Sequence, residues 1–195
     1  MRKSPFAVVF SGPTHMKPCS YSAAAALKDG TPASIRSIGP NDKPRLVELF
    51  QRLSARSVYF RFFHSKQRLT EGDLAELTEL DFDHRAALAA TVRENGDDRI
   101  IGVIRYTVVA GSPAYRRRAE VNFAVTDEHQ GRGVGKLLLR HLVLFARGRG
   151  IAEFEAYVLP ENKRMLALFD GSGYKIARTL ESGVIHIRFP IGDTR

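Results

Sequence analysis

The spacing of apolar residues predicts helices in several parts of the chain. Residues 46–53 carry an apolar stripe behind the capping sequence Pro40-Asn41-Asp42, and residues 70–80 carry leucines at helical spacing. Residues 57–64 are expected to form a short helix or an irregular turn, and residues 162–169 a further short helix. The most convincing helix has its apolar positions at Val134, Leu137, Leu138, Leu142 and Phe145. It is expected to end in the sequence Arg147-Gly148-Arg149-Gly150, where cations and glycines are typical of a helix C-terminus.

The segments between these helices have the pattern of strands and hairpins. Residues 25–38 predict a hairpin around Asp29-Gly30, because this pair supplies the positive φ of a tight turn. Residues 86–92 and 100–109 flank a second turn at 95–98. Residues 120–125 alternate strictly, which places Val121, Phe123 and Val125 on one face of a strand and Glu120, Asn122 and Ala124 on the other. Later strands are expected at 154–159, 174–180 and 184–189, the last two joined at Ser182-Gly183.

This order of elements predicts an α/β fold built on a mixed sheet flanked by helices. The 195 residues suffice for one domain. Residues 1–22 have no sustained period, so we expect them to be a flexible N-terminal extension, with the domain spanning residues 23–191.

Composition narrows the class of protein. Hydrophobic residues make up 44% and charged residues 26%, which is typical of a globular chain. The single cysteine, Cys19, excludes an internal disulfide and favours a reducing compartment. No apolar run approaches the roughly 18 residues of a membrane span, and the apolar stretch 6–10 is too short for a signal peptide. We therefore predict a cytoplasmic protein without a membrane partner.

The net charge favours an anionic partner. Lys and Arg number 30 against 21 Asp and Glu, which leaves +9 at pH 7. Such a balance suits a nucleic acid, a membrane surface or a phosphorylated small molecule. An acidic segment, 71–98, interrupts the basic parts, and its residues 71–83 would attract a cationic substrate. The aromatic run 59–63 resembles a base-stacking surface, but its phenylalanines are expected in the core and no readout motif accompanies it, so we predict no nucleic-acid partner.

A glycine-rich turn between the strand 120–125 and the helix 134–147 carries the strongest chemical signal. Its sequence is Gln130-Gly131-Arg132-Gly133-Val134-Gly135-Lys136. A turn of this kind presents successive backbone N–H groups at the positive end of a helix, which suits a phosphate group. A Walker A loop would need Gly at 130 and Ser or Thr at 137, and a dinucleotide fingerprint would need Gly at 136, so neither fits.

The pattern that fits is Q/R-x-x-G-x-G, which resembles the coenzyme A pyrophosphate loop of the GNAT superfamily of N-acetyltransferases. Further segments resemble the acetyltransferase domain of bacterial protein-lysine acetyltransferases, over roughly residues 24–190. They are Ser57–Phe63, Leu80–Asp83, Ala119–Phe123 and Leu159–Asn162. The resemblance implies a GNAT-like sheet that is mostly antiparallel and a segment 57–63 on the acceptor side of the site.

The resemblance also implies a role for each site residue. A lysine amine has a reference pKa near 10.4, so a general base is useful at neutral pH, and Glu120 aligns with the base of the family. The backbone of Phe123 to Val125 would pair with the pantetheine arm of acetyl-CoA, and the Val125 N–H would polarise the thioester oxygen. The pyrophosphate would be held by Gln130, Gly131, Arg132, Gly133, Gly135 and Lys136.

The helix at 162–169 supplies the last two candidate cofactor contacts. Asn162 lies where the family often contacts the cofactor, and it is equally suited to cap the helix. Phe169 stands in the helix in which many relatives carry a tyrosine acid, so the acid for the departing thiolate is unassigned. The six histidines have no metal-ligand spacing, and no metal is predicted.

The function predicted from these features is acetyl transfer from acetyl-CoA to an amine by direct attack in a ternary complex. A protein lysine is the leading acceptor and a small amine the alternative. A CoA-binding sensor without turnover is a second alternative, against which the retention of Glu120 argues.

Overall fold

The computed structural model describes residues 20–192, which form one sheet with helices on both faces. The strands lie in the order β1-β2-β3-β4-β5-β6-β8-β7. Their bounds are β1 Ser22–Ala26, β2 Pro32–Ser37, β3 Arg85–Glu94, β4 Asp97–Val108, β5 Arg117–Val125, β6 Ile151–Val158, β7 Ala177–Glu181 and β8 Val184–Pro190. Neighbouring strands are antiparallel except β5 and β6, which are parallel. The predicted α/β class with a mixed, mostly antiparallel sheet is confirmed.

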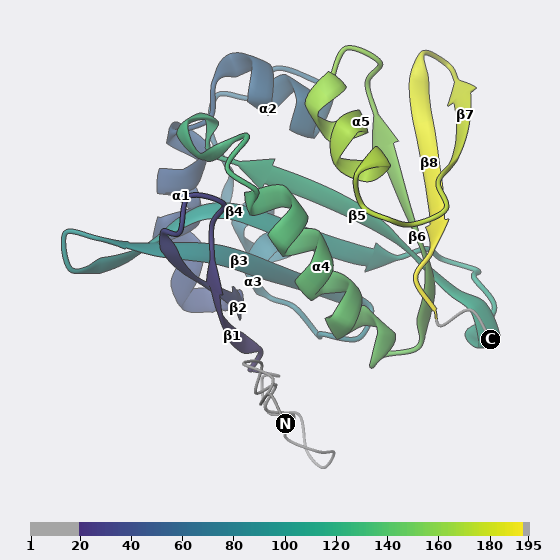
Figure 1. Cartoon of the computed structure of the whole chain (residues 1–195), viewed down its shortest axis with the longest axis horizontal. Coiled ribbons are helices and arrows are strands. Elements are labelled where there is room, and N and C mark those ends of the chain that lie inside the picture. Colours follow the sequence, from purple (N-terminus) through teal and green to yellow (C-terminus); the bar gives the residue numbers. More distant parts are fainter. Residues whose placement is uncertain (1–19, 193–195) are drawn as a thin grey trace.

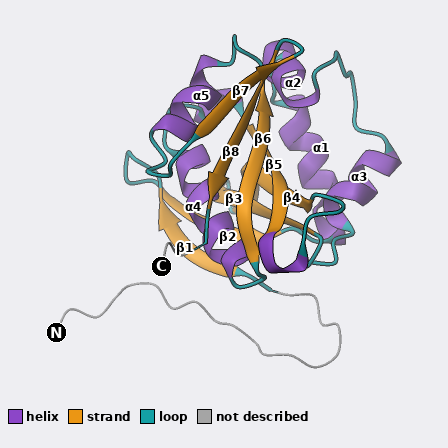
Figure 2. Cartoon of the chain, turned by 90° about the vertical axis from the view of Figure 1, so that its right-hand side faces the viewer, coloured by secondary structure: helices purple, strands orange, loops and turns teal. Residues whose placement is uncertain are grey.

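The helices divide between the two faces of the sheet, as Figures 1 and 2 show. They are α1 Lys43–Gln51, α2 Ala55–Phe62, α3 Glu71–Thr78, α4 Val134–Arg147 and α5 Lys163–Asp170. Helices α4 and α5 cover one face, and α1 to α3 cover the other. Short 3-10 turns precede α1 at Pro40–Asp42, β5 at Ala114–Arg116 and the glycine-rich turn at Asp127–His129.

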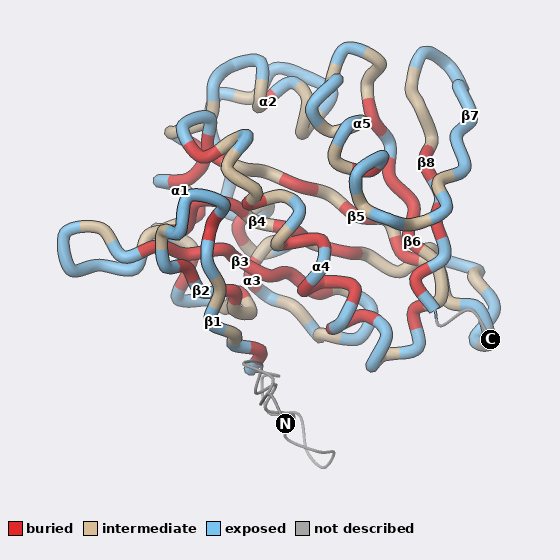
Figure 3. The backbone as a smooth tube through the Cα atoms, in the orientation of Figure 1, coloured by how far each residue is buried: buried red, intermediate tan, exposed pale blue. Residues whose placement is uncertain are grey.

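Two apolar clusters fill the space between the sheet and its helices. The larger one lies under α4 and α5, where Val121 and Phe123 of β5 pack with Leu138 and Leu142 of α4. The smaller one lies under α1 and α3 and includes Leu46, Leu49 and Leu74, with Ala124 of β5 packed against it. Figure 3 shows the buried residues running along the central strands and through α4. The alternation of β5 therefore directs Glu120 and Asn122 to the α1–α3 face.

The β3–β4 hairpin has a tighter turn than the sequence predicts. Glu94 pairs with Asp97, so Asn95 and Gly96 alone form the turn. Both have positive φ, 53° and 90°, as a two-residue turn between twisted strands requires. The first hairpin is also shifted, because β1 begins at Ser22 and ends before Leu27.

Helix α2 corrects an expectation about the aromatic run. The segment 55–62 is helical, but its aromatic side chains are not in the core: Val58 is its buried residue, and Tyr59 and Phe63 are 46% and 38% exposed. The reason is that α2 lies at the end of the sheet, where Phe60 and Phe63 line a cleft rather than an apolar interior.

The boundary of the N-terminal extension also differs from the sequence interpretation. Residues 1–19, including Cys19, lie outside the described part of the chain. Tyr21 is 5% exposed and packs edge-on against Phe145 of α4, and Ser22 already belongs to β1. The Tyr21 hydroxyl and Nδ1 of His141 are hydrogen-bonded at 2.6 Å. The domain thus includes at least these two residues of the segment that the sequence assigns to the extension.

His141 gives the fold an expected dependence on pH. Burial lowers the pKa of His141, and the neighbouring Arg140 acts in the same direction. The unfolded chain therefore binds a proton near pH 6.5 that the folded chain takes up only at lower pH. We expect the contribution of His141 to the free energy of unfolding to be complete above pH 6.5. As the pH falls below that value, this contribution should be lost at up to about 1.4 kcal/mol per pH unit.

Urea unfolding between pH 8 and pH 5 measures this effect. His141→Gln should flatten the dependence, whereas His64→Gln, at an exposed position, should not change it. An equal slope in the parent protein and in His141→Gln would contradict the assignment.

Candidate active site

The glycine-rich turn ends in a helix N-terminus that no side chain caps. Gly131 and Gly133 have φ of 77° and 92°, values that glycine adopts without strain. Gly133 is the N-cap of α4, and its first turn receives no side-chain hydrogen bond. The first amides of a helix have no partner within the helix, and its dipole favours an anion there. The residues present therefore fit a bound phosphate or pyrophosphate.

Gly133 and Gly135 also permit close packing around the turn. A Cβ atom on Gly133 would lie 2.9 Å from Cγ of Lys28, and one on Gly135 would overlap with Cδ1 of Leu168 in α5. Gly135 thus brings α5 against the first turn of α4. Gly135 therefore contributes to the site by allowing this close packing, a role that the spacing of the glycine motif does not predict.

The polar side chains of the turn have different environments. Arg132 forms an ion pair with Asp29 at 2.6 Å and donates to Oγ1 of Thr31, which ties the turn to the first hairpin. Lys136 is exposed on the first turn of α4, and no ion pair involves it among residues 20–192. The sequence assigns two cations to a pyrophosphate. Of these, Lys136 is available to bind an anion, whereas Arg132 is already paired with Asp29.

The side chain of Gln130 joins three elements. Its Nε2 donates to Oγ of Ser57 and to the carbonyl oxygen of Val125, both at 3.1 Å. Its Oε1 accepts from Arg164 of α5 at 2.6 Å. Gln130 therefore holds the turn to α2, β5 and α5, a role in positioning that is compatible with cofactor contact.

The parallel strands β5 and β6 separate beside this turn. Their pairing begins at Arg117 with Ile151 and ends at Glu120 with Glu155. Beyond this point, residues 121–125 of β5 have no partner on β6, and Figure 1 shows α5 above the gap. A cleft lies in the opening between the strands. Its lining includes Val121, Asn122 and Phe123 of β5, Ala156, Tyr157 and Val158 of β6, Phe60, Arg61 and Phe63 near α2, and Asn162, Met165 and Phe169.

The backbone of β5 directs two amides toward this opening. The Thr126 N–H donates to the Ile101 carbonyl on the β4 side at 3.0 Å. Because successive amides of a strand point to opposite sides, the N–H groups of Val125 and Phe123 point away from β4. The Val125 carbonyl faces the same way, since it accepts from Gln130. This free edge is suited to pair with an extended amide-bearing chain.

Asn162 and Phe169 lie at the α5 side of the cleft. The Asn162 side chain accepts from the Met165 N–H at 3.2 Å and so caps α5. Phe169 is fully buried, with its ring edge-on to Phe123 at 5.9 Å between centroids. A phenylalanine here has no proton to give, and its burial places it at the base of the cleft.

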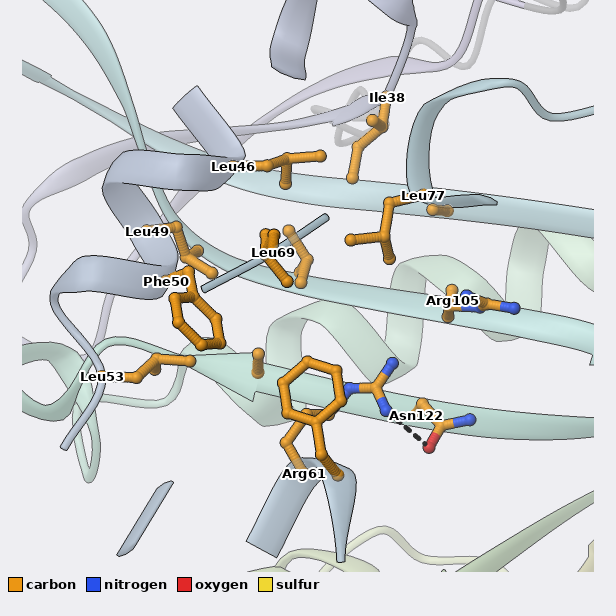
Figure 4. Close-up of a pocket in the computed structure, with 14 residues that line it drawn as sticks. Ile38, Leu46, Leu49, Phe50, Leu53, Arg61, Leu69, Leu77, Arg105 and Asn122 are labelled. Atoms are coloured by element: carbon orange, nitrogen blue, oxygen red, sulfur yellow. Dashed lines mark hydrogen bonds between the residues drawn. The ribbon is translucent and has the colours of Figure 1, made fainter. Parts of the chain in front are cut away.

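Glu120 belongs to a polar network on the α1–α3 face. Its Oε1 accepts from Nδ2 of Asn122 at 2.9 Å, and Oδ1 of Asn122 accepts from Arg61 of α2 at 3.3 Å. Arg105 of β4 lies directly across from Asn122 in the register and donates to Oγ1 of Thr107 at 3.0 Å. Figure 4 shows Arg61 reaching Asn122 from α2, with Arg105 on the adjacent strand.

Charges of both signs surround Glu120. Burial, and after it the charge of Arg105, lowers the pKa of Arg61 to about 10, while Glu120 opposes this shift. Burial also lowers the pKa of Arg105, against the attraction of Glu76 and Glu120. For both arginines, burial outweighs the attraction of Glu120.

The β6 side of Glu120 carries a second carboxylate. Glu155 pairs with Glu120 in the parallel register and is 5% exposed. It lies 3.8 Å from Arg118 and 3.4 Å from Nε2 of His186. The His186 ring stacks on Tyr157 at 4.6 Å between centroids. Burial, and then Glu155 and Glu120, raises the pKa of Tyr157.

Sequence reasoning placed the segment 57–63 on the acceptor side but gave no individual role to Arg61, and it gave none to Arg105, Asn122 or Glu155. Their approach depends on the register of three strands and on where α2 lies, which a linear pattern does not encode. The one available signal was alternation, because Asn122 shares the face of Glu120 two residues along the strand.

The other candidate features have local structural roles. His129 is buried, and its Nδ1 lies 2.9 Å from Oγ1 of Thr126. In the acidic stretch, Asp73 caps α3, and Asp81 accepts from the amides of Asp83, His84 and Arg85. Within residues 20–192, no cluster of His, Cys, Asp and Glu has the geometry of a metal site. In the same part of the chain, no helix has the length and apolarity to cross a membrane.

Comparison with known proteins gives consistent results. The profile of the acetyltransferase (GNAT) family matches residues 47–174. Acetyltransferase PA5475 of Pseudomonas aeruginosa is 28% identical over 149 residues, which are 76% of this chain and 78% of that protein.

Solved structures share the fold. The GNAT domain of S. lividans PAT superposes with a TM-score of 0.78 at 40% identity, over 87% of this chain and 96% of that one. The protein yncA of Salmonella typhimurium, solved with acetyl-CoA, has a TM-score of 0.66 over 83% of this chain and 95% of its own. At 19% identity, the second likeness concerns the fold alone.

Proposed function

The chain belongs to the GNAT family of acetyltransferases, and from this premise we propose that it transfers the acetyl group of acetyl-CoA to a protein lysine. The observation that carries the proposal is the separation of β5 from β6 beyond Glu120. In this opening, the free edge of β5 runs from the carboxylate of Glu120 at one end to the uncapped N-terminus of α4 at the other. A thioester donor with a pantetheine arm and a pyrophosphate needs these features in this order.

Residues of the turn and of β5 would hold the donor. The amides of Gly131 to Gly135 and the ammonium of Lys136 would bind the pyrophosphate. The edge amides of Phe123 and Val125 would pair with the pantetheine arm, with Asn162 and Phe169 bounding the cleft. Arg132 and Gln130 would act mainly by fixing the turn. The donor supplies an acyl carbon that is open to nucleophilic attack.

Glu120 would take a proton from the acceptor ammonium. The neutral amine nitrogen then forms a bond to the acyl carbon, the carbon–sulfur bond breaks, and the Val125 N–H stabilises the charge on the carbonyl oxygen. A second proton leaves the nitrogen as the amide forms, and the departing sulfur ends as a thiol. Direct transfer needs no acyl-enzyme.

A small amine is the second candidate acceptor. The specific observation in its favour is the position of Arg61 and Arg105 next to Glu120, neither of them in a direct ion pair within residues 20–192, which suits a compact acceptor that carries its own anion. The experiment that decides between the two acceptors compares kcat/KM for lysine-containing peptides and proteins with that for small amines. A higher value for peptides supports the proposal, and turnover of small amines alone refutes it.

Asn122 is expected to act as a positioning residue for Glu120. Because Arg61 donates to Oδ1 of Asn122, the amide nitrogen must face Glu120, and it donates there at 2.9 Å. Asn122→Asp is nearly isosteric, but it places a second negative charge beside Glu120. We expect the acidic limb of the pH profile of kcat/KM to move upward by about one pH unit.

Asn122→Leu separates the hydrogen bond from the charge. It should lower kcat by about tenfold, with little change in the position of the acidic limb. Thr179→Asp, which adds a charge on the exposed strand β7, is the control and should leave the profile in place. A parental pH profile in Asn122→Asp would refute the positioning role.

A further inference from the structure

Two arginines beside Glu120, Arg61 and Arg105, are attracted by its carboxylate but form no direct ion pair in the described part of the chain. The guanidinium group of Arg61 donates to Asn122, and that of Arg105 donates to Thr107. Nε of Arg105 is buried and has no hydrogen-bond partner. Among residues 20–192, no carboxylate lies within ion-pair distance of either guanidinium group. Both arginines are half-buried, and charges in such positions are ordinarily paired, so a ligand carboxylate would complete the arrangement.

The pair is held in place from two elements. Arg105 projects from β4 on the face shared with Asn122, and its bond to Thr107 draws its guanidinium toward the residue directly across from Glu120. Arg61 reaches Asn122 from α2, and its guanidinium lies 5.0 Å from the ring centre of Phe62. Both groups are therefore oriented before any ligand binds.

Both arginines line a small, mostly apolar pocket on the α1–α3 face of the sheet. Its walls are apolar side chains such as Leu49, Phe50 and Leu77, and its polar part consists of Arg61, Arg105 and Asn122. Figure 4 shows these polar groups along one side of the pocket and the leucines along the other. Arg61 also lines the cleft between β5 and β6, so it joins the pocket to the site of acetyl transfer.

Different charged side chains lie on the two sides of Glu120 across the sheet. The α2 and β4 side carries Arg61 and Arg105, and the β6 side carries the buried Glu155, which is paired with Arg118 at 3.8 Å. A bare ammonium ion near Glu120 would be repelled by the two arginines. An acceptor with both an ammonium and a carboxylate could place its ammonium near Glu120 and its carboxylate near the two arginines.

We propose that Arg61 and Arg105 bind a carboxylate that the acceptor carries close to its reacting amine. The proposal rests on the acetyl transfer to an amine in the proposed function and specifies the acceptor. The carboxylate belongs either to an acidic residue next to a target lysine or to a small amino acid. Guanidinium groups suit this ligand because their N–H donors match carboxylate oxygens.

Matched acceptors test the proposal. One arm compares lysine peptides with Glu or Gln at each position flanking the lysine, and the other compares amino acids with their carboxamides. We expect kcat/KM to favour the carboxylate member of a pair by about tenfold or more in one arm, which identifies the source. Arg61→Gln and Arg105→Gln should reduce that ratio toward one. Comparing ratios between protein variants cancels any difference in amine basicity within a pair.

Two further sets of variants make the test specific. Arg61→Lys and Arg105→Lys keep the charge and should retain part of the preference, and they serve where a glutamine variant does not fold. Arg99→Gln, which removes an arginine at the far end of β4 that pairs with Glu94, should keep the full preference. Equal kcat/KM for both members of every pair, or a preference that survives in Arg61→Gln and Arg105→Gln, would overturn the proposal.

A binding measurement separates this proposal from the proposed function. Calorimetry with N-acetylated amino acids and peptides, as carboxylate or amide, needs no turnover. Tighter binding of the carboxylate form that depends on Arg61 and Arg105 supports the subsite even if no amine is acetylated, in which case only the proposed function fails. Equal binding of both forms overturns the subsite and leaves the proposed function intact.

Discussion

Replacing Glu120 by Gln is expected to lower kcat by about 10²- to 10⁴-fold, the range of a lost general base. Glutamine keeps the size of the side chain and still accepts the hydrogen bond that Asn122 donates. It cannot take a proton from the acceptor ammonium. The affinity for acetyl-CoA should be unchanged, because the donor contacts are expected from the edge amides of β5 and from the glycine-rich turn.

Steady-state kinetics across pH, together with calorimetric titration of acetyl-CoA, measures both parts of this expectation. The loss should be largest near neutral pH and smaller at high pH, where more of the amine is already deprotonated. Glu48→Gln is the matched control, since Glu48 is exposed on α1. If Glu120→Gln retained full turnover at every pH, another group would be the base.

Replacing Gly133 by Val is expected to weaken acetyl-CoA binding by about ten- to a hundredfold. Gly133 has φ of 92°, and a β-branched residue in this conformation costs about 1–3 kcal/mol, which corresponds to about a 5- to 150-fold loss of affinity and so spans the expected range, if the turn shifts to relieve the strain. Its Cβ would also lie 2.9 Å from Cγ of Lys28. A backbone shift that relieves the strained φ or the contact with Lys28 would move the amides at the start of α4.

The chain offers a closely matched control for backbone strain. Gly96 has φ of 90° in the β3–β4 turn, and a Cβ there would meet no atom within 4 Å. Gly96→Val should therefore lose stability to a similar extent and keep its affinity for acetyl-CoA. Thermal unfolding and calorimetry on both variants make the comparison. Normal affinity in a folded Gly133→Val would refute the pyrophosphate site at this turn.

The sequence predicts the backbone of the site better than its side chains. Alternation along residues 120–125 correctly places Val121 and Phe123 against α4, because one face of β5 is buried under that helix. The spacing of glycines correctly predicts the turn before α4, because Gly131 and Gly133 adopt positive φ. Both signals are local, so they need no knowledge of the rest of the fold.

The parts that were missed depend on distant segments. Arg61 meets Asn122 across a separation of 61 residues, and Arg132 meets Asp29 across 103. Tyr21 is buried only because α4 supplies His141 and Phe145. The aromatic residues of α2 look like core in the sequence, yet they line a cleft that exists only because β5 and β6 separate. Such contacts are set by register and docking rather than by composition.

The central claim is direct acetyl transfer from acetyl-CoA to an amine. It is tested most directly by measuring, in one reaction, the thiol released from acetyl-CoA and the acetylated amine identified by mass spectrometry. The account predicts that thiol release depends on the amine, that the two products form in a one-to-one ratio, and that no acetyl group stays on the protein. Tight binding of acetyl-CoA without thiol release for any peptide or small amine would contradict it, as would an acetylated protein formed in the absence of an amine.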